Sequence, residues 1–233
     1  MNVYQIRLKL FLLKDISINN VQSMITRFID KSFLLDETLS MLHEENVYKN
    51  YCYDLLCPVE KDKIYKRGKI YTLTIRTVDE RYAEFFYHVC PNVFTRELKG
   101  LTAEIRTLPR KTIEFVYTLT PIILKDERGY WKDCMSEEEF KNRININLAK
   151  KVNQLFTPVT NECLEPKAFY STIEFLNRTP VPMQYKNVRL LGDKIRLSIL
   201  DDKLSQTLAY FALGVGIGEM NSRGAGFLNY RWL

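Results

Sequence analysis

The sequence predicts an α+β fold in which antiparallel sheets carry helices packed on one face. Segments with alternating polar and apolar residues, typical of strands, recur along the chain. Runs with apolar residues three and four positions apart, typical of helices, lie between these segments. The chain has 233 residues, of which 46% are hydrophobic, so it is long enough for one large domain or two small ones with cores of their own.

The first half begins with a predicted strand over residues 3–12, in which apolar and polar residues alternate. A helix follows Ser17, and its apolar positions repeat as one buried face should: Val21, Met24, Ile25, Phe28 and Ile29. Asp36 is the expected N-cap of a short second helix that ends in "MLHEE".

Further strands are predicted over residues 69–79, 101–108 and 112–124, with a helix over residues 79–89 after the first of them. The resulting order of strand, two helices, strand, helix and strand is that of a ferredoxin-like unit with one additional helix.

The second half is predicted to form a similar unit. Ser136 and Glu139 form an S-x-x-E capping box that opens a long helix. Residues 187–200 are predicted to form a hairpin around Gly192 and Asp193. Asp201 or Asp202 caps a final helix, and the strand "GFLNYRWL" follows a glycine-rich loop. We therefore expect two α+β domains in tight contact, over residues 1–115 and 116–233.

Composition limits the possible functions. No apolar run approaches the roughly 18 residues that span a bilayer, and the first residues lack the features of a signal peptide, so a cytoplasmic location is expected. The five cysteines are scattered without a C-x-x-C pair, and the visible acidic clusters lie where helices begin. We therefore expect no metal and no cofactor. The net charge of +6 is compatible with a polyanionic partner.

A loop near the end of the sequence contains four of the nine glycines. They are Gly216, Gly218, Gly224 and Gly226. Glycine allows positive φ, and such a loop can point several N–H groups at a phosphate. The side chains of Asn221, Ser222 and Arg223 add donors. The alternative interpretation is a tight helix-to-strand connection with glycines for packing. The order helix, glycines, strand excludes a P-loop and a dinucleotide fingerprint.

Two basic segments are candidates for contact with the phosphates of a polyanionic partner. Lys66 and Arg67 lie in a basic stretch over residues 61–76, and Arg189, Lys194 and Arg196 lie in the predicted hairpin. The alternative interpretation of each is a solvated charged surface.

Four short segments form a pattern that extends over most of the chain. The most specific is Gly-Ile-Gly, five residues, Gly-Ala-Gly-Phe, over residues 216–227. The others are "YTLTPIIL" (117–124), a helix with an N-L-x-x-K element from Asn147 to Lys151, and "LH" at residues 42–43 with a lysine shortly after. Together they closely resemble the CRISPR-associated endoribonucleases that cut precursor crRNA within its repeats. These enzymes belong to the RAMP superfamily of tandem ferredoxin-like, RRM-like proteins.

The resemblance implies a reaction and its residues. The substrate's 2′-OH attacks the adjacent phosphorus without a metal, giving mature crRNA and a 2′,3′-cyclic phosphate end. His43 is the implied general acid or base, and Lys49 is the implied cation that stabilises the phosphorane charge. The loop from Gly216 to Gly226 is the implied RNA-holding element.

The chain departs from the family at the second proton carrier. Many relatives have a tyrosine on the first helix, whereas this helix has Phe28 and no tyrosine. Either Tyr48 or Tyr51 is available instead, or the reaction proceeds without one.

The implied partners are CRISPR repeat RNA, as precursor crRNA, and other subunits of an interference complex. Two alternatives to the nuclease stay open. One is a non-catalytic RAMP-type subunit that holds crRNA in an interference complex. The more distant one is a protein-interaction module that binds no RNA.

Overall fold

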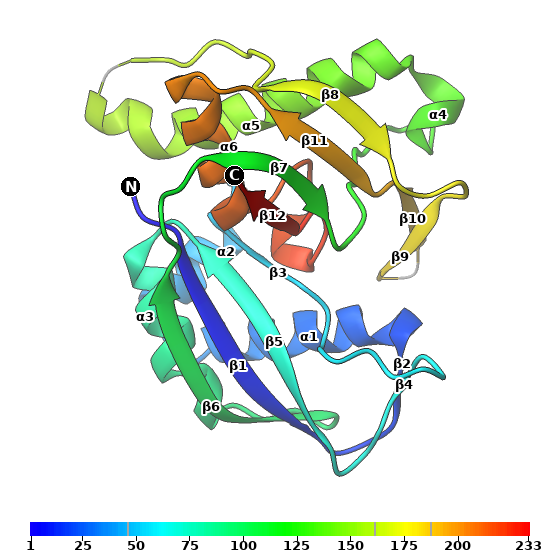
Figure 1. Ribbon diagram of the computed structural model, residues 1–233. Coiled ribbons are helices and arrows are strands. Elements are labelled where there is room, and N and C mark those ends of the chain that lie inside the picture. Colours follow the sequence, from blue (N-terminus) through cyan, green and yellow to red (C-terminus); the bar gives the residue numbers. More distant parts are fainter. Residues whose placement is uncertain (46, 161, 187) are drawn as a thin grey trace.

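The computed structural model describes residues 1–45, 47–160, 162–186 and 188–233, without the side chains of residues 43 and 44. Two four-stranded antiparallel sheets lie one above the other in Figure 1. Their strand orders are β3-β5-β1-β6 and β12-β7-β11-β8. Both sheets therefore have the ferredoxin-like arrangement, in which the first and third of the four strands are central.

The first unit contains β1 and β5 at the centre of its sheet, with α1 and α3 packed on one face (Figure 1). Its elements are β1 (Tyr4–Leu12), β2 (Ile16–Ser17), α1 (Ile18–Phe33), α2 (Glu37–Glu44), β3 (Tyr51–Tyr53), β4 (Ile64–Tyr65), β5 (Ile70–Thr77), α3 (Glu80–His88), η1 (Cys90–Asn92) and β6 (Leu98–Thr107). The cap that the sequence predicts for α2 is present, since Asp36 accepts from Leu39 N–H at 2.9 Å. Ser17, which precedes α1, accepts from Asn19 N–H.

The second unit repeats this order with a small additional sheet of β9 and β10. Its elements are β7 (Ile113–Thr118), α4 (Trp131–Cys134), α5 (Glu137–Thr160), β8 (Tyr170–Phe175), β9 (Val181–Tyr185), β10 (Val188–Gly192), β11 (Ile195–Ile199), α6 (Lys203–Val215), η2 (Asn221–Arg223) and β12 (Leu228–Trp232). Ser136 Oγ accepts from Glu139 N–H at 3.1 Å, as the capping box predicts. Asp202 is the residue that caps α6.

The α+β prediction with two ferredoxin-like units is confirmed. The boundary predicted between residues 115 and 116 falls inside β7, and the division into two domains stays a prediction. The short strand β3 lies outside every segment predicted as a strand. It pairs with the edge of β5, and its three residues are too few to show a period.

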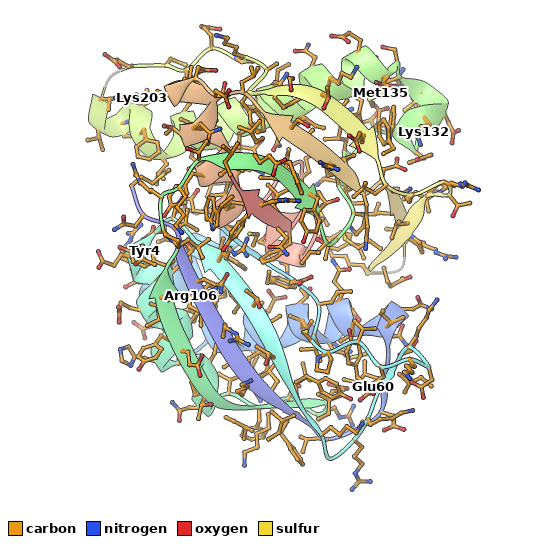
Figure 2. All side chains as sticks on the ribbon, viewed as in Figure 1. Tyr4, Glu60, Arg106, Lys132, Met135 and Lys203 are labelled. Carbon is orange, nitrogen blue, oxygen red and sulfur yellow. The ribbon has the colours of Figure 1, made fainter. Side chains whose placement is uncertain are left out.

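The predicted hairpin around Gly192 and Asp193 is wrong. β10 pairs with β9, whereas β11 pairs with β7 and β8, so the chain crosses from the small sheet to the main sheet at this point. The reason is the side chain of Asp193, which is fully buried. Its carboxylate accepts from Trp131 Nε1 and Asn177 Nδ2, both at 2.6 Å, and from Tyr130 Oη, with Lys132 Nζ at 3.4 Å (Lys132 is labelled in Figure 2).

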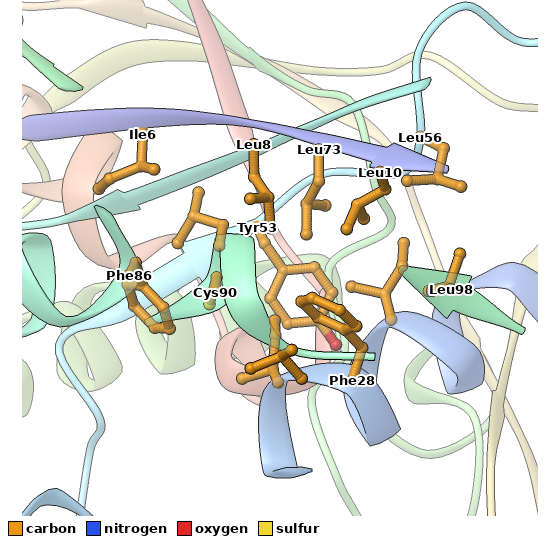
Figure 3. Close-up of a cluster of buried hydrophobic side chains, with 14 of the residues drawn as sticks. Ile6, Leu8, Leu10, Phe28, Tyr53, Leu56, Leu73, Phe86, Cys90 and Leu98 are labelled. Carbon is orange, nitrogen blue, oxygen red and sulfur yellow. The ribbon is translucent and has the colours of Figure 1, made fainter. Parts of the chain in front are cut away.

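The first unit has a core rich in aromatic side chains, between its sheet and its helices. Figure 3 shows Leu8, Leu10 and Leu73 of the sheet facing Phe28 of α1 and Phe86 of α3. These five side chains are completely buried. Completely burying a leucine or phenylalanine side chain contributes about 1.5–3 kcal/mol, so this core holds α1 firmly below the sheet.

A buried guanidinium joins the two units. Arg76 on β5 donates from Nε to Gln5 Oε1 at 3.0 Å and from Nη1 to the Leu228 carbonyl oxygen at 2.6 Å. Its guanidinium also lies 4.6 Å from the centroid of the Phe227 ring. A buried charge is tolerated when hydrogen bonds and an aromatic face replace water. Arg76 therefore fixes the start of β12 against the first sheet.

We predict that Asp193→Ala lowers the free energy of unfolding by about 3 kcal/mol, because it leaves the buried donors of Trp131 and Asn177 without acceptors. Urea denaturation followed by tryptophan fluorescence measures this difference. Asp201→Ala is the control, since Asp201 is exposed, and it should change stability by less than about 0.5 kcal/mol. Equal stability of the two variants would contradict the anchoring role of Asp193.

Candidate functional site

A cavity of about 590 Å³ brings together segments that are far apart in the sequence. Residues 45 and 47–51, which follow α2, line it and are called here the α2 wall. Residues 219–223 of the glycine loop (216–226) also line it and are called the glycine-loop wall. Lys151 and Gln154 of α5 complete the lining together with Lys125, Tyr185 and Val215.

His43 lies on the last turn of α2, two positions before the first residue of the α2 wall. Its side chain lies outside the described residues, so its predicted catalytic role stays a prediction. The other histidine, His88, lies at the end of α3 with its side chain 66% exposed, and its Nε2 is 3.1 Å from Glu84 Oε2. His88 is not among the residues that line the cavity.

Lys49, the predicted cation, lies in the α2 wall. Its Nζ donates to the carbonyl oxygens of Leu42, at 2.6 Å, and Glu45, at 2.5 Å. Both carbonyls belong to the end of α2, where a cation is favoured by the helix dipole. The ammonium is therefore held at the helix turn that carries His43.

The pKa of Lys49 depends on charges in both walls. Partial burial lowers the pKa of Lys49, the positive charge of Arg223 lowers it further, and the carboxylate of Glu45 opposes both. Arg223 belongs to the glycine-loop wall. The α2 wall and the glycine-loop wall therefore interact electrostatically.

The structure distinguishes the two candidate tyrosines. Tyr51 is 1% exposed, its ring packs against Phe33, Tyr82 and Phe86, and its hydroxyl has no partner among the described residues. Tyr48 is half-buried in the α2 wall, and its hydroxyl oxygen accepts from Asn147 Nδ2 at 3.3 Å. Burial and the carboxylate of Glu219 raise the pKa of Tyr48, against the opposing hydrogen bond from Asn147, and this favours the neutral hydroxyl.

The glycine loop folds around Asn221. The Asn221 Nδ2 donates to the carbonyl oxygens of Ile217 and Ala225, both at 3.0 Å. Gly216 and Gly218 have φ angles of 74° and 69°, values that favour glycine. A Cβ at Gly216 would also lie 2.6 Å from Asn221 Nδ2. These glycines are therefore needed for the internal packing of the loop.

The N–H groups of three of the four glycines bind within the protein, so in this structure they are not free donors for a phosphate. Gly216 N–H donates to Ala212, Gly224 N–H to Asn221 and Gly226 N–H to Pro121, in each case to a carbonyl oxygen. All four glycines are buried. The alternative interpretation, glycines for packing, describes these residues, and RNA binding by Gly216, Gly218, Gly224 and Gly226 stays an untested prediction.

Lys151 supplies the charge inside the loop. Its side chain is 2% exposed, and its Nζ donates to three oxygens: Gly216 O at 3.0 Å, Gly218 O at 2.7 Å and Asn221 Oδ1 at 2.6 Å. Burial lowers the pKa of Lys151 to about 7. Three acceptors match the three N–H donors of an ammonium group, so they favour the charged form.

The glycine-loop wall is also attached to the first unit. Arg223 Nη1 lies 2.7 and 2.6 Å from the two carboxylate oxygens of Asp30 on α1, and Gln22 Nε2 donates to the Arg223 carbonyl oxygen at 2.6 Å. Arg223 thus holds the loop against α1, a contact that the sequence does not predict. Asn221 is buried and Ser222 is half-buried, and both line the cavity as residues of the predicted loop. RNA binding by Asn221, Ser222 and Arg223 remains a prediction.

The other predicted RNA-binding residues lie outside the cavity. Lys66 pairs with Asp62, and the Arg67 N–H donates to Asp15 Oδ1 at 2.7 Å. These residues lie near Glu60, which Figure 2 labels beside β2 and β4.

Arg189, Lys194 and Arg196 belong to the second unit. Arg189 is exposed on β10. The Arg196 guanidinium lies over the Phe115 ring, 3.9 Å from its centroid, on the sheet face that also carries Glu174. The structure does not bring these residues to the cavity lining, and their contact with RNA stays a prediction.

The residues that the structure describes contain neither a candidate metal site nor a candidate membrane span. Within these residues, no group of three His, Cys, Asp or Glu side chains is arranged to hold a metal ion. In the same part of the chain, no helix is both long and apolar enough to cross a bilayer.

A family model described as "CRISPR associated protein Cas6, C-terminal" matches residues 105–230, more than half of the chain. The chain belongs to the Cas6 family. This assignment confirms the resemblance to the RAMP superfamily that the glycine loop and the three other segments carry. No curated protein matches the sequence.

Solved structures share the fold of the whole chain. One described as "CRISPR associated protein Cas6" has a TM-score of 0.72 at 21% identity, with 98% of this chain and 99% of that chain covered. "An RAMP protein binding different RNA substrates" has a TM-score of 0.71 at 19% identity, with 98% and 99% covered. The structure from "Characterization of a Cas6-related gene from Pyrococcus furiosus" has a TM-score of 0.67 at 18% identity, with 98% of both chains covered.

A partly buried carboxyl group lies near Lys194 and Arg76. Burial raises the pKa of Asp54 to about 6, while the N–H of Leu55 and the charges of Arg76 and Lys194 act in the opposite direction. The folded protein therefore binds this proton more tightly than the unfolded chain does. The bound proton therefore stabilises the folded protein fully at low pH. This stabilisation decreases as the pH rises through the range from about 4 to about 6.

We predict that Asp54→Asn removes this dependence. Between about pH 5 and about pH 7.5, the wild type should lose about 1–2 kcal/mol of unfolding free energy relative to the variant. Urea denaturation at both pH values measures the change, with Asp201→Asn as an exposed control that follows the wild type. A constant difference between wild type and Asp54→Asn would show that Asp54 does not titrate in this range.

Proposed function

We propose that this Cas6 family member is a metal-independent endoribonuclease that cleaves CRISPR repeat RNA in precursor crRNA. The observation that carries the proposal is the cavity lined by both the α2 wall and the glycine-loop wall. Its lining includes Glu45, the C-cap of the helix that bears His43, together with Lys49 and residues 219–223 of the loop implied to hold RNA. A pocket of this size accommodates a nucleotide at the scissile phosphate.

Each part of the reaction is assigned to a residue of the α2 wall or of the end of α2. The 2′-OH of the RNA attacks the neighbouring phosphorus as its proton passes to a base, and the P–O5′ bond breaks as the 5′-oxygen receives a proton. His43 takes one of the two proton transfers. Lys49 stabilises the negative charge that develops on the phosphorane oxygens. The products are mature crRNA and a 2′,3′-cyclic phosphate end.

Tyr48 takes the other proton transfer. It replaces the tyrosine that relatives carry on the first helix, where this chain has the fully buried Phe28. The hydroxyl of Tyr48 is the one on the α2 wall with a partner that orients it, since Asn147 Nδ2 donates to its oxygen. Its own proton therefore points away from Asn147.

The substrate class is supported by similarity and by charge. A protein with the same fold is described as binding different RNA substrates. The basic residues outside the cavity, Lys66, Arg67, Arg189, Lys194 and Arg196, are available for the rest of the RNA strand through phosphate contacts. Such contacts make affinity decrease steeply with salt concentration.

We predict that His43→Ala lowers the single-turnover cleavage rate by about 100-fold or more, because one proton transfer loses its carrier. The measurement uses repeat RNA transcribed from a CRISPR array of the same genome, in EDTA, with filter binding in parallel. His88→Ala is the matched control, and it should cleave at the wild-type rate. An RNA with 2′-deoxyribose at the scissile position should bind and stay intact.

Three other outcomes would indicate a different function or a different mechanism. Tight, salt-dependent binding without cleavage by the wild type would establish the non-catalytic RAMP-type subunit instead. Loss of wild-type cleavage in EDTA would replace the mechanism with a metal-dependent one. The absence of both binding and cleavage would favour the protein-interaction module.

We predict that Tyr48→Phe lowers the cleavage rate constant by about 10- to 100-fold with little change in RNA affinity, because it removes only the proton donor. Tyr51→Phe removes a buried hydroxyl without a partner among the described residues, so it should leave the rate unchanged. Single-turnover kinetics at saturating enzyme compare the two. Equal rates for both variants would exclude Tyr48 as a proton carrier.

A further inference from the structure

One face of α5 carries polar side chains that point into the protein. Asn147, Lys151 and Gln154 lie at positions i, i+4 and i+7, which share one side of a helix. Asn147 is 5% exposed and Lys151 is 2% exposed. Burying an amide or an ammonium group is unfavourable unless its hydrogen bonds are satisfied. The donors of this stripe therefore require acceptors, and these acceptors lie in the α2 wall and the glycine loop, whereas Asn147 Oδ1 has no partner among the described residues.

Lys151 contacts the glycine loop. Its Nζ binds Gly216, Gly218 and Asn221. These three hydrogen bonds therefore join the start of the loop to the first residue of η2. The same Asn221 binds the carbonyl oxygens of Ile217 and Ala225. One ammonium group thus connects α5 to the whole internal hydrogen-bond network of the loop.

Asn147 and Gln154 contact the α2 wall. Gln154 binds the main chain of Tyr48 twice: its Oε1 accepts from Tyr48 N–H and its Nε2 donates to Tyr48 O, both at 2.8 Å. Asn147 Nδ2 donates to the hydroxyl oxygen of the same tyrosine. The ring of Tyr48 also lies 5.7 Å from Lys151 Nζ. Tyr48 is therefore fixed at both ends by α5.

We propose that Lys151, with Asn147 and Gln154, is a positioning residue that holds the α2 wall and the glycine-loop wall in register for RNA cleavage. This inference rests on the proposed function. The walls come from different halves of the chain, and α5 contacts both through side chains only one or two helical turns apart. Lys151 does not reach the substrate, because all three of its donors bind protein oxygens.

The physical reason is the accuracy that proton transfer requires. A shift of about 1 Å in the relative position of reacting groups can lower a rate by about 100-fold. The α2 wall carries Lys49 and Tyr48, whereas the glycine-loop wall is the part implied to hold RNA. A helix that binds both walls sets the distance between catalyst and substrate.

The test compares Lys151→Met with Lys150→Met. Lys150 is the exposed neighbour on α5, so its variant removes the same charge without touching the loop. Hydrogen–deuterium exchange should be at least ~10-fold faster in Lys151→Met over residues 216–226 and 47–50, and unchanged in Lys150→Met. The single-turnover rate constant at saturating enzyme should decrease by about 10- to 100-fold, with a smaller change in the dissociation constant of repeat RNA.

A role in stability alone gives a different result. It would reduce the reaction amplitude, which counts folded molecules, and leave the rate constant of those molecules unchanged. That result, or exchange equal to the wild type over both segments, would overturn the proposal. If the wild type cleaves no RNA, the proposed function fails, and the exchange comparison alone still decides whether Lys151 holds the two walls.

Gln154→Met provides a second variant in case Lys151→Met does not fold. It removes the two hydrogen bonds to Tyr48 and leaves the ammonium group in place. Exchange should then increase over residues 47–50 but not over residues 216–226, and the rate constant should decrease again by about 10-fold. Wild-type exchange over residues 47–50 with a wild-type rate constant would contradict the proposal.

Discussion

Three oxygens of the glycine loop converge on the Nζ of Lys151. A charge this deeply buried is tolerated when several oxygens converge on it, and here two of the three are main-chain carbonyls of Gly216 and Gly218. Carbonyl groups so close in sequence can face one point because both residues have positive φ. The glycines are therefore explained by what lies inside the loop, and the outer surface of the loop is left to Ser222 and its neighbours.

The two units are joined by guanidinium groups that reach in opposite directions. Arg76 extends from the first unit to the main chain of β12, and Arg223 extends from the second unit to Asp30 on α1. Each arginine has oxygen acceptors that are fixed in the other unit, so the contact has a defined geometry. The cavity is lined by residues of both units, and Arg223 is itself part of the lining.

Local features of the fold were predictable because their causes are local. Ser17, Asp36 and Ser136 act on N–H groups two or three residues ahead, and alternation along a strand is visible within a few residues. The crossing at Gly192 and Asp193 was not predictable, since Trp131 and Asn177, which bind the Asp193 carboxylate, are distant in sequence. A glycine followed by an aspartate carries the same local signal in a hairpin and in a crossing.

The candidate site was predictable in its parts but not in its connections. The lysine after α2 and the glycine loop lie on one cavity, as the resemblance implies. The orientation of the loop's N–H and carbonyl groups was not predictable. A high glycine content indicates conformational freedom of the main chain, but it does not indicate which of these groups face inward. Lys151 belongs to a recognised N-L-x-x-K element, yet its role depends on contacts about 65 residues away in sequence. No sequence feature indicated the role of Gln154.

The Asp30–Arg223 pair links an early helix to a late loop, and this has a consequence for synthesis. The ribosome completes α1, α2 and Lys49 long before it reaches Arg223, so a growing chain can fold its first sheet while the partner of Asp30 is still missing. The lining of the cavity is then complete only after residues 219–223 have been added. A nascent chain that has not reached the glycine loop therefore lacks part of the cavity lining.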